Sequence, residues 1–315
     1  MLQEPNPIGV LQEPNRTGVL QEPDRTGSQS RNEQKYLRQV KQPFGRKCYI
    51  RSMIYSLLQQ TVAAVREASS LMVREGFSVE EKGCVENIVT SSDLAVQHYL
   101  TEKLGTILPG SGFLCEEEDL SDTSHKYVWI VDPIDGTANY ARGLESCCIS
   151  VALTEAGTPV MGVVYSPWRG ELYHAVRGGG AFCNGKRIHA SDRPFAEGIL
   201  FTAMSTYHKE FARVCSDIIY DAYMDCNDLR RTGSAAVELC LMASGKAELY
   251  FELRLMPWDY AAAGLILEEA GGRICGFDGA APSLSQASLI VAGNTEENCR
   301  RMLETVRKHL PELPY

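Results

Sequence analysis

The sequence lacks any apolar run long enough to cross a bilayer, any cysteine–histidine spacing typical of zinc ligands, and any excess of positive charge. A membrane-spanning helix needs about 20 consecutive apolar residues, so we expect no membrane association. The net charge of −9 argues against a nucleic-acid surface, which normally carries a basic patch. No signal peptide is visible, and the eleven cysteines follow no regular spacing. We therefore expect reduced thiols and a cytoplasmic protein.

The composition is that of an ordinary globular protein. The chain has 315 residues, of which 44% are hydrophobic and 23% charged, enough for one large or two ordinary domains. Residues 1–50 differ from the rest, because a nine-residue unit with Gln-Glu-Pro and a glycine at fixed places begins at Leu2, Leu11 and Leu20. So much proline and glycine with so little apolar surface predicts a disordered N-terminal extension.

Beyond this extension the patterns predict two halves of different organisation. In residues 51–190, apolar residues at helical spacing predict helices over 53–72 and 93–108, and alternating runs then predict an antiparallel meander. In residues 191–315, strands and helices alternate, which predicts an α/β half. The expected helices are 209–220, 234–244, 257–270 and 295–310; the expected strands are 199–202, 247–251, 273–275 and 288–292. The fold class is therefore a layered combination of α+β and α/β.

The most informative segment is Asp132-Pro133-Ile134-Asp135-Gly136-Thr137, which follows the apolar run 127–131. Proline fixes φ and has no N–H, so the chain is expected to turn at Pro133 instead of continuing as a strand. The two carboxylates and the Ile134 carbonyl are the oxygen ligands that a hard divalent cation prefers. If a helix starts at Gly136 and Thr137, their N–H groups form an anion site beside the cation.

Three further acidic sites lie at expected ends of strands or helices. Glu116 and Glu117 follow the apolar run 112–115, and Asp93 and Asp259 each stand at the start of an expected helix. An isolated pair of carboxylates is more often a solvated turn, but recurrence at element ends favours a shared site. Asp93 also fits a simple helix cap, and Glu117 fits a solvated neighbour.

In order and in spacing, these segments resemble those of the inositol monophosphatase family, a branch of the magnesium-dependent, lithium-sensitive phosphatases that includes fructose-1,6-bisphosphatase. The resemblance runs from about Met53 to the C-terminus and rests on the Glu116-Glu117 step, the Asp132–Thr137 hexapeptide and Trp258-Asp259. It implies the layered α-β-α-β-α sandwich of that family, a homodimer, and inhibition by lithium.

The resemblance also implies a role for individual residues. The metal ligands would be Glu116, Asp132, the Ile134 carbonyl, Asp135 and Asp259. Gly136 and Thr137 would hold the phosphate and position a water, with Asp93 supporting Thr137 and Glu116 or Glu117 assisting. Substrate contacts would come from Gly136, Thr137, Gly233, Ser234, Glu252 and Asp259. A carboxylate-rich set without histidine or cysteine favours Mg²⁺ over Zn²⁺ as the cofactor.

These residues predict a Mg²⁺-dependent phosphatase of a small phosphorylated polyol, with inositol monophosphate favoured because Glu252 precedes Asp259 by seven residues, as in inositol-type enzymes. Three departures from the family pattern weaken the inositol assignment: Cys115 replaces a usual glycine, Arg254 replaces a small residue, and Ala141-Arg142-Gly143 makes the loop after the hexapeptide more basic. Two alternatives stay open. One is a phosphatase of adenosine 3′,5′-bisphosphate, NADP or fructose 1,6-bisphosphate, and the other is an inactive relative whose bound metal serves partner recognition.

Overall fold

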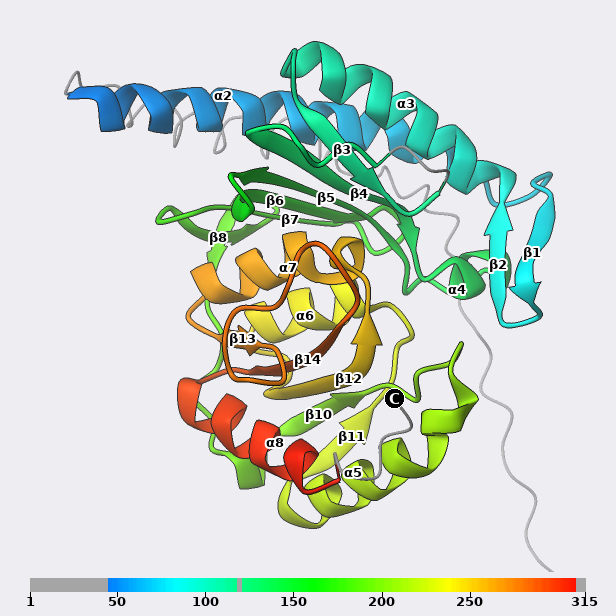
Figure 1. The fold of residues 1–315 in the computed structure, drawn as a ribbon, viewed down its shortest axis with the longest axis vertical. Helices are drawn as coiled ribbons and strands as arrows, with labels where there is room; N and C mark the ends of the chain where they lie inside the picture. Colours follow the sequence, from blue (N-terminus) through cyan, green and yellow to red (C-terminus); the bar gives the residue numbers. More distant parts are fainter. Residues whose placement is uncertain (1–44, 118–120, 310–315) are drawn as a thin grey trace, which may run out of the picture. The chain divides into compact units, whose positions relative to one another are not determined.

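The computed structural model describes residues 45–117 and 121–309, with side chains from residue 52 onward (Figure 1). The predicted nine-residue repeats and most of the predicted extension 1–50 lie outside the described residues. The first described helix, α2 (Gly45–Ala68), begins eight residues before the predicted start at Met53. Residues 46–52 contain neither proline nor glycine, so nothing in them stops the helix from extending that far.

Within the described residues, the larger sheet has seven strands in the order β3-β4-β5-β6-β7-β8-β9. Its first pair is parallel, and every later neighbour is antiparallel. The predicted meander is therefore confirmed, and the glycine-rich residues 177–179 join two of its antiparallel strands. The strands are β3 (Gly112–Cys115), β4 (Tyr127–Asp135), β5 (Cys148–Glu155), β6 (Thr158–Ser166), β7 (Glu171–Val176), β8 (Gly180–Cys183) and β9 (Lys186–Ile188).

The second sheet of the described residues has five strands in the order β11-β10-β12-β14-β13. Its first three strands in that order are parallel, and β14 runs antiparallel to both of its neighbours. The four predicted strands are present, and sequence patterns missed β11 because three residues give no periodic signal. The strands are β10 (Ile199–Thr202), β11 (Asp228–Arg230), β12 (Leu249–Leu255), β13 (Arg273–Cys275) and β14 (Ser288–Gly293).

Helices and sheets alternate in layers, as predicted (Figure 1). Helices α2 and α3 (Ser91–Ile107) cover the outer face of the seven-stranded sheet, and α6 (Ala235–Ala243) and α7 (Pro257–Glu269) lie between the two sheets. Helices α5 (Ala212–Asp225) and α8 (Glu296–Lys308) cover the far face of the five-stranded sheet. The shorter elements are η1 (Ser69–Leu71), the hairpin of β1 (Val79–Cys84) and β2 (Asn87–Thr90), α4 (Thr137–Ala141), η2 (Phe195–Glu197) and η3 (Lys209–Phe211).

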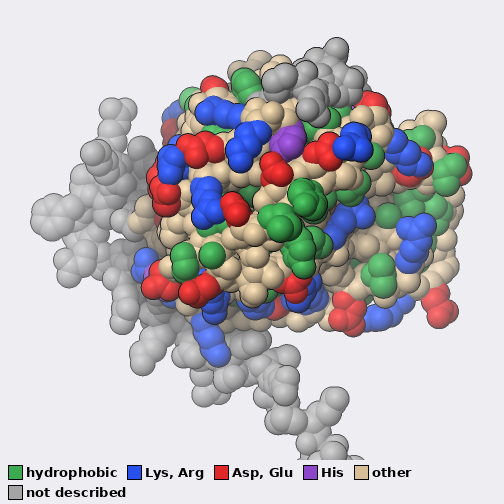
Figure 2. All heavy atoms as spheres, turned by 90° about the horizontal axis from the view of Figure 1, so that it is seen from below, with side chains coloured by type: hydrophobic (Ala, Val, Ile, Leu, Met, Phe, Trp, Pro, Cys, Tyr) green, Lys and Arg blue, Asp and Glu red, His purple; other side chains and the backbone are tan. Residues whose placement is uncertain are grey.

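The α5 and α8 face of the molecule is seen in Figure 2, where acidic and basic side chains are interspersed. A few apolar side chains gather near the middle of this face, and α5 contributes the exposed residues Tyr220, Tyr223 and Met224. Among the described helices, none combines the length and the apolar character that a membrane crossing requires.

The described residues all fall into one compact unit. This grouping does not test the predicted division into halves at about residue 190, which stays a prediction.

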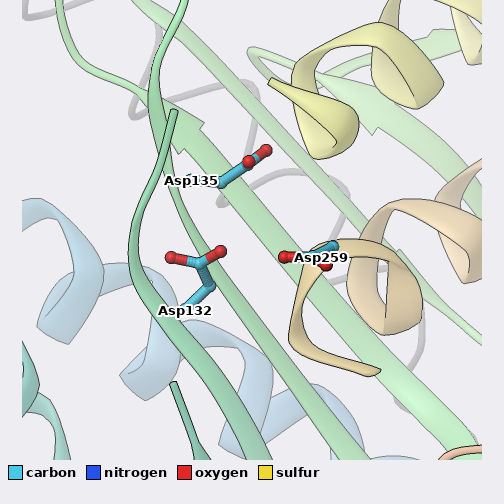
Figure 3. A group of neighbouring side chains, drawn as sticks. All are labelled: Asp132, Asp135 and Asp259. Atoms are coloured by element: carbon cyan, nitrogen blue, oxygen red, sulfur yellow. The ribbon is translucent and has the colours of Figure 1, made fainter. Parts of the chain in front are cut away.

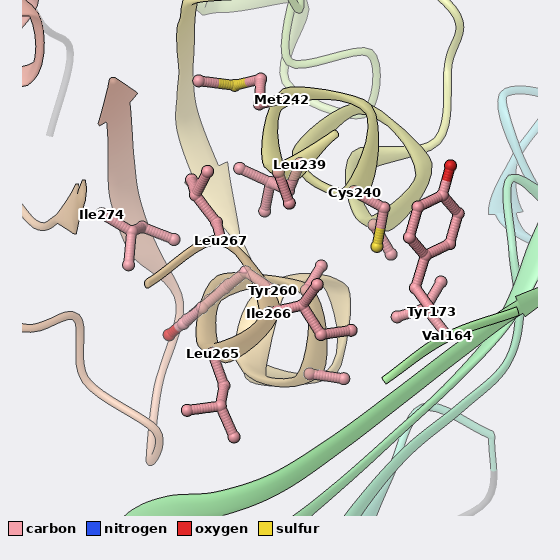
Figure 4. Packing of buried hydrophobic residues seen from close by; sticks show 14 of the residues in the cluster. Val164, Tyr173, Leu239, Cys240, Met242, Tyr260, Leu265, Ile266, Leu267 and Ile274 are labelled. Atoms are coloured by element: carbon pink, nitrogen blue, oxygen red, sulfur yellow. The ribbon is translucent and has the colours of Figure 1, made fainter. Parts of the chain in front are cut away.

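The main core fills the space between the sheets, where α6 and α7 are apolar on all sides (Figure 4). Leu239, Cys240 and Ile266 are fully buried there, and such all-round burial requires a helix without a polar face. Helix α7 approaches the sheet closely because β6 presents a glycine to it. A Cβ on Gly162 would lie 2.6 Å from the carbonyl oxygen of Ala262. This close contact fixes the height of α7, and therefore of its first turn, above the sheet.

We expect Gly162→Ala to lower the free energy of unfolding by about 1–3 kcal/mol, because the added methyl group overpacks this contact. Urea denaturation measures the change. The control is Gly105→Ala on α3, where a Cβ would meet only ring carbons of Phe113 at 3.9 and 4.0 Å. That variant should be neutral or more stable by up to about 1 kcal/mol. Equal stability of both variants would contradict the close packing of α7.

Candidate functional site

Strand β4 carries Asp132 and Asp135 into the interior, where their exposed fractions are 1% and 8%. The prediction that the strand ends at Pro133 is wrong, because β4 continues to Asp135. Its pairing with β5 shifts register between the two aspartates, as at a β-bulge. A bulge leaves residues outside the regular ladder, so it accommodates a proline that has no N–H to donate. Because the backbone is irregular here, the side chains of Asp132 and Asp135 do not have to follow the strict alternation between the two faces of the sheet that a regular strand imposes.

Helix α7 supplies the third carboxylate. Asp259 lies in its first turn, and its Oδ2 accepts a hydrogen bond of 2.7 Å from the backbone N–H of Met256. One carboxylate oxygen each from Asp132, Asp135 and Asp259 lies within 4.8 Å of the other two. Asp132 and Asp259 direct oxygens towards each other, whereas the carboxylate of Asp135 extends towards the start of α6 (Figure 3). Three predicted ligands are thus brought together.

Asp135 is held in place by the N-terminus of α6. Its Oδ2 accepts hydrogen bonds from the Ser234 hydroxyl at 2.6 Å and from the Ala236 backbone N–H at 2.7 Å. The N-terminus of a helix stabilises negative charge. Both of these bonds engage the same oxygen of Asp135. Ser234 is 2% exposed and is the N-cap of α6. Its predicted role as a substrate contact therefore stays a prediction, beside an observed structural role.

Thr137 and Asp93 form a contact that the sequence predicted. The Thr137 Oγ1 lies 3.0 Å from Asp93 Oδ1 and 3.0 Å from the Ile134 carbonyl oxygen, so its proton serves one of the two at a time. Asp93 is also the third residue of a capping box at the start of α3, where its Oδ2 accepts from the Thr90 N–H at 2.9 Å. Both interpretations of Asp93, as a cap and as the partner of Thr137, therefore hold.

Glu116 and Glu117 follow β3, whose parallel pairing with β4 places them beside Asp132. The charge of Glu116 contributes to raising the pKa of Asp132, and Glu117 is 5% exposed. Sequence reasoning missed Lys82 on β1, whose ammonium lies 3.2 Å from Glu116 Oε1 and also pairs with Glu117. No local pattern marks Lys82, because its hairpin is folded over the site by contacts far away in sequence.

The charges of the cluster are poorly compensated. Burial, followed by the charges of Glu116, Asp135 and Asp259, raises the pKa of Asp132 well above its usual value. Burial also raises the pKa of Asp135 to about 6, and burial and the charge of Glu116 raise that of Glu117 to about 7. Asp132 Oδ1 is buried and has no hydrogen-bond partner among the described residues. An oxygen-only donor set with such an unpartnered atom fits a divalent cation.

Glycines allow backbone segments to approach each other closely at the site. Gly136 has φ +88°, and a Cβ on it would lie 2.9 Å from the Ser146 carbonyl oxygen and 3.3 Å from that of Gly233. Only glycine therefore fits at this N-cap of α4. Gly233 has φ +84° and precedes the N-cap of α6. The two predicted phosphate and substrate contacts, Gly136 and Gly233, thus approach each other from the two halves of the chain.

Glu252 lies in the middle of β12 and is half-buried. Its Oε2 accepts from the Tyr250 hydroxyl at 3.3 Å, and a backbone hydrogen bond joins it to Ser205. Loss of hydration and the charge of Glu238 raise the pKa of Glu252 to about 8. The charge of Glu252 also acts on Asp259, so the predicted substrate carboxylate lies near the aspartate cluster. A register shift between Glu252 and Leu255 carries Arg254 to a separate cavity lined by Phe211 and Arg307.

Comparison with known proteins agrees with this geometry. The model of the inositol monophosphatase family matches residues 49–310. The Nus factor SuhB of Escherichia coli K12 is 33% identical over 266 residues, which cover 82% of this chain and 98% of the relative. The structure of the extragenic suppressor protein suhB of Bartonella henselae superposes with a TM-score of 0.74 at 28% identity and covers 80% of this chain and 99% of that one.

Solved structures of the inositol monophosphatase II of Staphylococcus aureus are also similar. The form bound to inositol monophosphate has a TM-score of 0.67 at 28% identity and covers 82% of this chain and 96% of that one. The form bound to 2′AMP has a TM-score of 0.69 at 26% identity with the same coverage. Similarity to a whole family over most of the chain supports phosphatase activity and a metal-dependent site at the acidic cluster, and it leaves the substrate open.

The raised carboxylate pKa values predict how the metal-free protein responds to pH. An acid whose pKa is higher in the folded state binds more protons there, so stability falls as pH rises from its unfolded pKa near 4 towards the folded pKa. In chelator, we expect the melting temperature to fall by about 5 °C between pH 4.5 and 7.5. Added divalent cation at pH 7.5 should restore it, because the bound charge offsets the repulsion. Differential scanning fluorimetry measures both.

Asp132→Asn should weaken this pH dependence and abolish the stabilisation by added cation, because it removes one of the two carboxylates whose pKa is raised well above its usual value. The matched control is Asp192→Asn, an exposed aspartate outside the cluster. It should respond like the parent. A cation effect of equal size in Asp132→Asn would contradict metal binding at the cluster.

Proposed function

The chain belongs to the inositol monophosphatase family, and from this premise we propose that it hydrolyses a phosphate monoester with Mg²⁺ held by the carboxylate cluster. The observation that carries the proposal is the convergence of Asp132, Asp135 and Asp259 within 4.8 Å, with Asp132 Oδ1 left without a protein partner. Buried like charges at this separation are stable as a group only when a cation or protons compensate them.

We propose that the full ligand set is Glu116, Asp132, the Ile134 carbonyl, Asp135 and Asp259. Carboxylate and carbonyl oxygens without histidine or cysteine favour Mg²⁺ over Zn²⁺. When bound, Mg²⁺ lowers the pKa of a water molecule and offsets the charge that develops on the ester oxygens. The helix N-termini at Asp135 and Asp259 each occupy only one oxygen of these two carboxylates. The other oxygen of each is left for a ligand.

The chain's own residues orient the reactants. With its proton directed to Asp93 Oδ1, the Thr137 hydroxyl presents a lone pair that can accept a hydrogen bond from the attacking water. Glu117, whose pKa is raised to about 7 by burial and the charge of Glu116, suits proton uptake near neutral pH. The water oxygen bonds to phosphorus as the ester P–O bond breaks, and the leaving alkoxide takes up a proton. Thr137 is therefore proposed as a water-positioning residue.

The phosphate would be held by N–H groups instead of side-chain cations. Gly136 and Thr137 form the beginning of α4, where backbone N–H groups are free of intrahelical partners. A phosphate monoester carries up to two negative charges, so the carboxylates alone would repel it. Binding of the substrate should consequently depend on bound metal. This dependence separates the proposal from a simple anion-binding surface.

Inositol monophosphate is the substrate that we propose first. Glu252 can accept a hydrogen bond from a ring hydroxyl, and the S. aureus relative has been solved with inositol monophosphate bound. Its structure with 2′AMP favours, as the second candidate, a phosphorylated nucleoside. The further alternatives of adenosine 3′,5′-bisphosphate, NADP and fructose 1,6-bisphosphate remain within the same chemistry.

The remaining family expectations stand as proposals: a homodimer, inhibition by lithium, a cytoplasmic location and no nucleic-acid partner. Relatives named Nus factor SuhB keep a non-enzymatic alternative in view, in which bound metal serves recognition of a partner. Measured phosphate release distinguishes the phosphatase from the recognition protein, because a recognition protein would bind metal at the same carboxylates without releasing phosphate.

Asp132→Asn should lower phosphate release by at least about 10³-fold while the protein stays folded, since one predicted metal ligand is lost and the local volume is unchanged. Malachite-green detection of phosphate gives the rate, and far-ultraviolet circular dichroism checks the fold. Asp192→Asn again serves as the control and should keep the parental rate. Near-parental turnover by Asp132→Asn would remove the basis of the metal assignment.

A phosphate-release screen tests the substrate. Inositol monophosphate, 2′AMP, adenosine 3′,5′-bisphosphate, NADP and fructose 1,6-bisphosphate are compared at equal concentration with Mg²⁺ and with chelator. We expect the highest kcat/KM on inositol monophosphate and no turnover in chelator. Preference for another ester by more than tenfold would reject the inositol assignment, and no turnover on any ester would favour the recognition alternative.

A further inference from the structure

Two parallel strands, β10 and β11, end side by side in the five-stranded sheet, next to the middle of β12. Strand β10 ends at Thr202, which pairs with Phe251 of β12, and β11 pairs with β10 on its other side. The segments that follow β10 and β11 therefore start close together. They carry Tyr207 after β10 and Arg231 after β11, and Glu252, in the middle of β12, directly follows the residue that pairs with the end of β10. This part of the sheet thus presents one aromatic, one basic and one acidic side chain.

Segment 203–208, which carries Tyr207, is held by contacts on three sides. Ser205 has the left-handed backbone angle φ 45° and forms a backbone hydrogen bond with the Glu252 carboxylate. Arg231 Nη2 donates to the Thr206 hydroxyl at 2.8 Å. Just beyond the segment, Lys209 forms an ion pair with Glu86 in the β1–β2 hairpin. A left-handed non-glycine residue implies that its surroundings over-determine the backbone, as is frequent at ligand sites.

Tyr207 is accessible and lies on the side of the carboxylate cluster. Its exposed fraction is 57%. The charges of Glu116 and of the three clustered aspartates add to loss of hydration in raising the pKa of its hydroxyl. The carboxylate of Glu252 can accept a hydrogen bond from a hydroxyl group of any sugar or polyol. Glu252 therefore does not by itself distinguish one leaving group from another.

We propose that Tyr207 is a specificity-determining residue whose ring contacts the leaving group of the ester and adds affinity when that group is a nucleoside, so that the site also accepts the second candidate substrate. The inference rests on the proposed phosphatase function and deepens it. A nucleobase stacks on an aromatic ring, whereas an inositol ring offers no π face to it. The ring of Tyr207 therefore adds affinity for a phosphorylated nucleoside, and Glu252 serves the hydroxyl groups of both kinds of substrate.

The test compares Tyr207→Ala and Tyr207→Phe with the parent on 2′AMP and on inositol monophosphate. Tyr207→Ala should lower kcat/KM for 2′AMP about tenfold through a higher KM, and change that for inositol monophosphate less than twofold. Tyr207→Phe keeps the ring and should stay within twofold of the parent on both. The control is Phe277→Ala, which removes an aromatic ring of similar exposure, 53%, away from the cluster. It should leave both substrates unaffected.

A purely structural role for Tyr207 would lower both rates equally, and an uninvolved side chain would lower neither; either outcome overturns the inference. Binding of non-hydrolysable phosphonate analogues of both substrates in Mg²⁺, measured by calorimetry, separates this failure from that of the proposed function. If the parent turns over no ester, a tenfold loss of affinity in Tyr207→Ala for the nucleoside analogue alone still supports the inference. Equal affinities in parent and variant, or no binding of either analogue, overturn it.

Discussion

The structure depends on helix N-termini that hold negative charge inside the protein. Asp93 caps α3, Asp135 accepts from the first residues of α6, and Asp259 lies in the first turn of α7. Each N-terminus supplies N–H groups to one carboxylate oxygen, which lowers the free-energy cost of burying the charge. Because Asp135 and Asp259 each use only one oxygen in this way, these two carboxylates can still approach Asp132. The second oxygen of Asp93 instead faces the hydroxyl of Thr137. The layered fold is what brings three such helix ends to one place.

Close packing turns this convergence into a defined site. Helix α7 can lie low on the sheet because Gly162 faces Ala262, and its first turn then brings Asp259 to the aspartates of β4. At the other wall, Gly136 leaves room for the carbonyl of Gly233. The positions of the carboxylates are consequently set by backbone contacts between layers, which change little when single surface residues change.

Much of this architecture could be predicted from the sequence, because it follows from local patterns. The helical faces, the meander and the acidic residues at element ends all have a period or a motif. The turn expected at Pro133 was wrong because a bulge satisfies the same constraint within a strand. Lys82 and the bond from Ser234 to Asp135 could not be predicted, since both join residues that only the folded chain brings together. The ligand roles assigned to individual residues stay predictions.

The position of Lys82 has a consequence for how the protein exchanges ions with its surroundings. Its ammonium pairs with both Glu116 and Glu117, so the β1–β2 hairpin supplies a counter-ion to these carboxylates. If Glu116 ligates a divalent ion as proposed, that ion would compete with the lysine for the same oxygen. Its apparent affinity would then include the cost of displacing the lysine, and its binding would be coupled to the position of the hairpin.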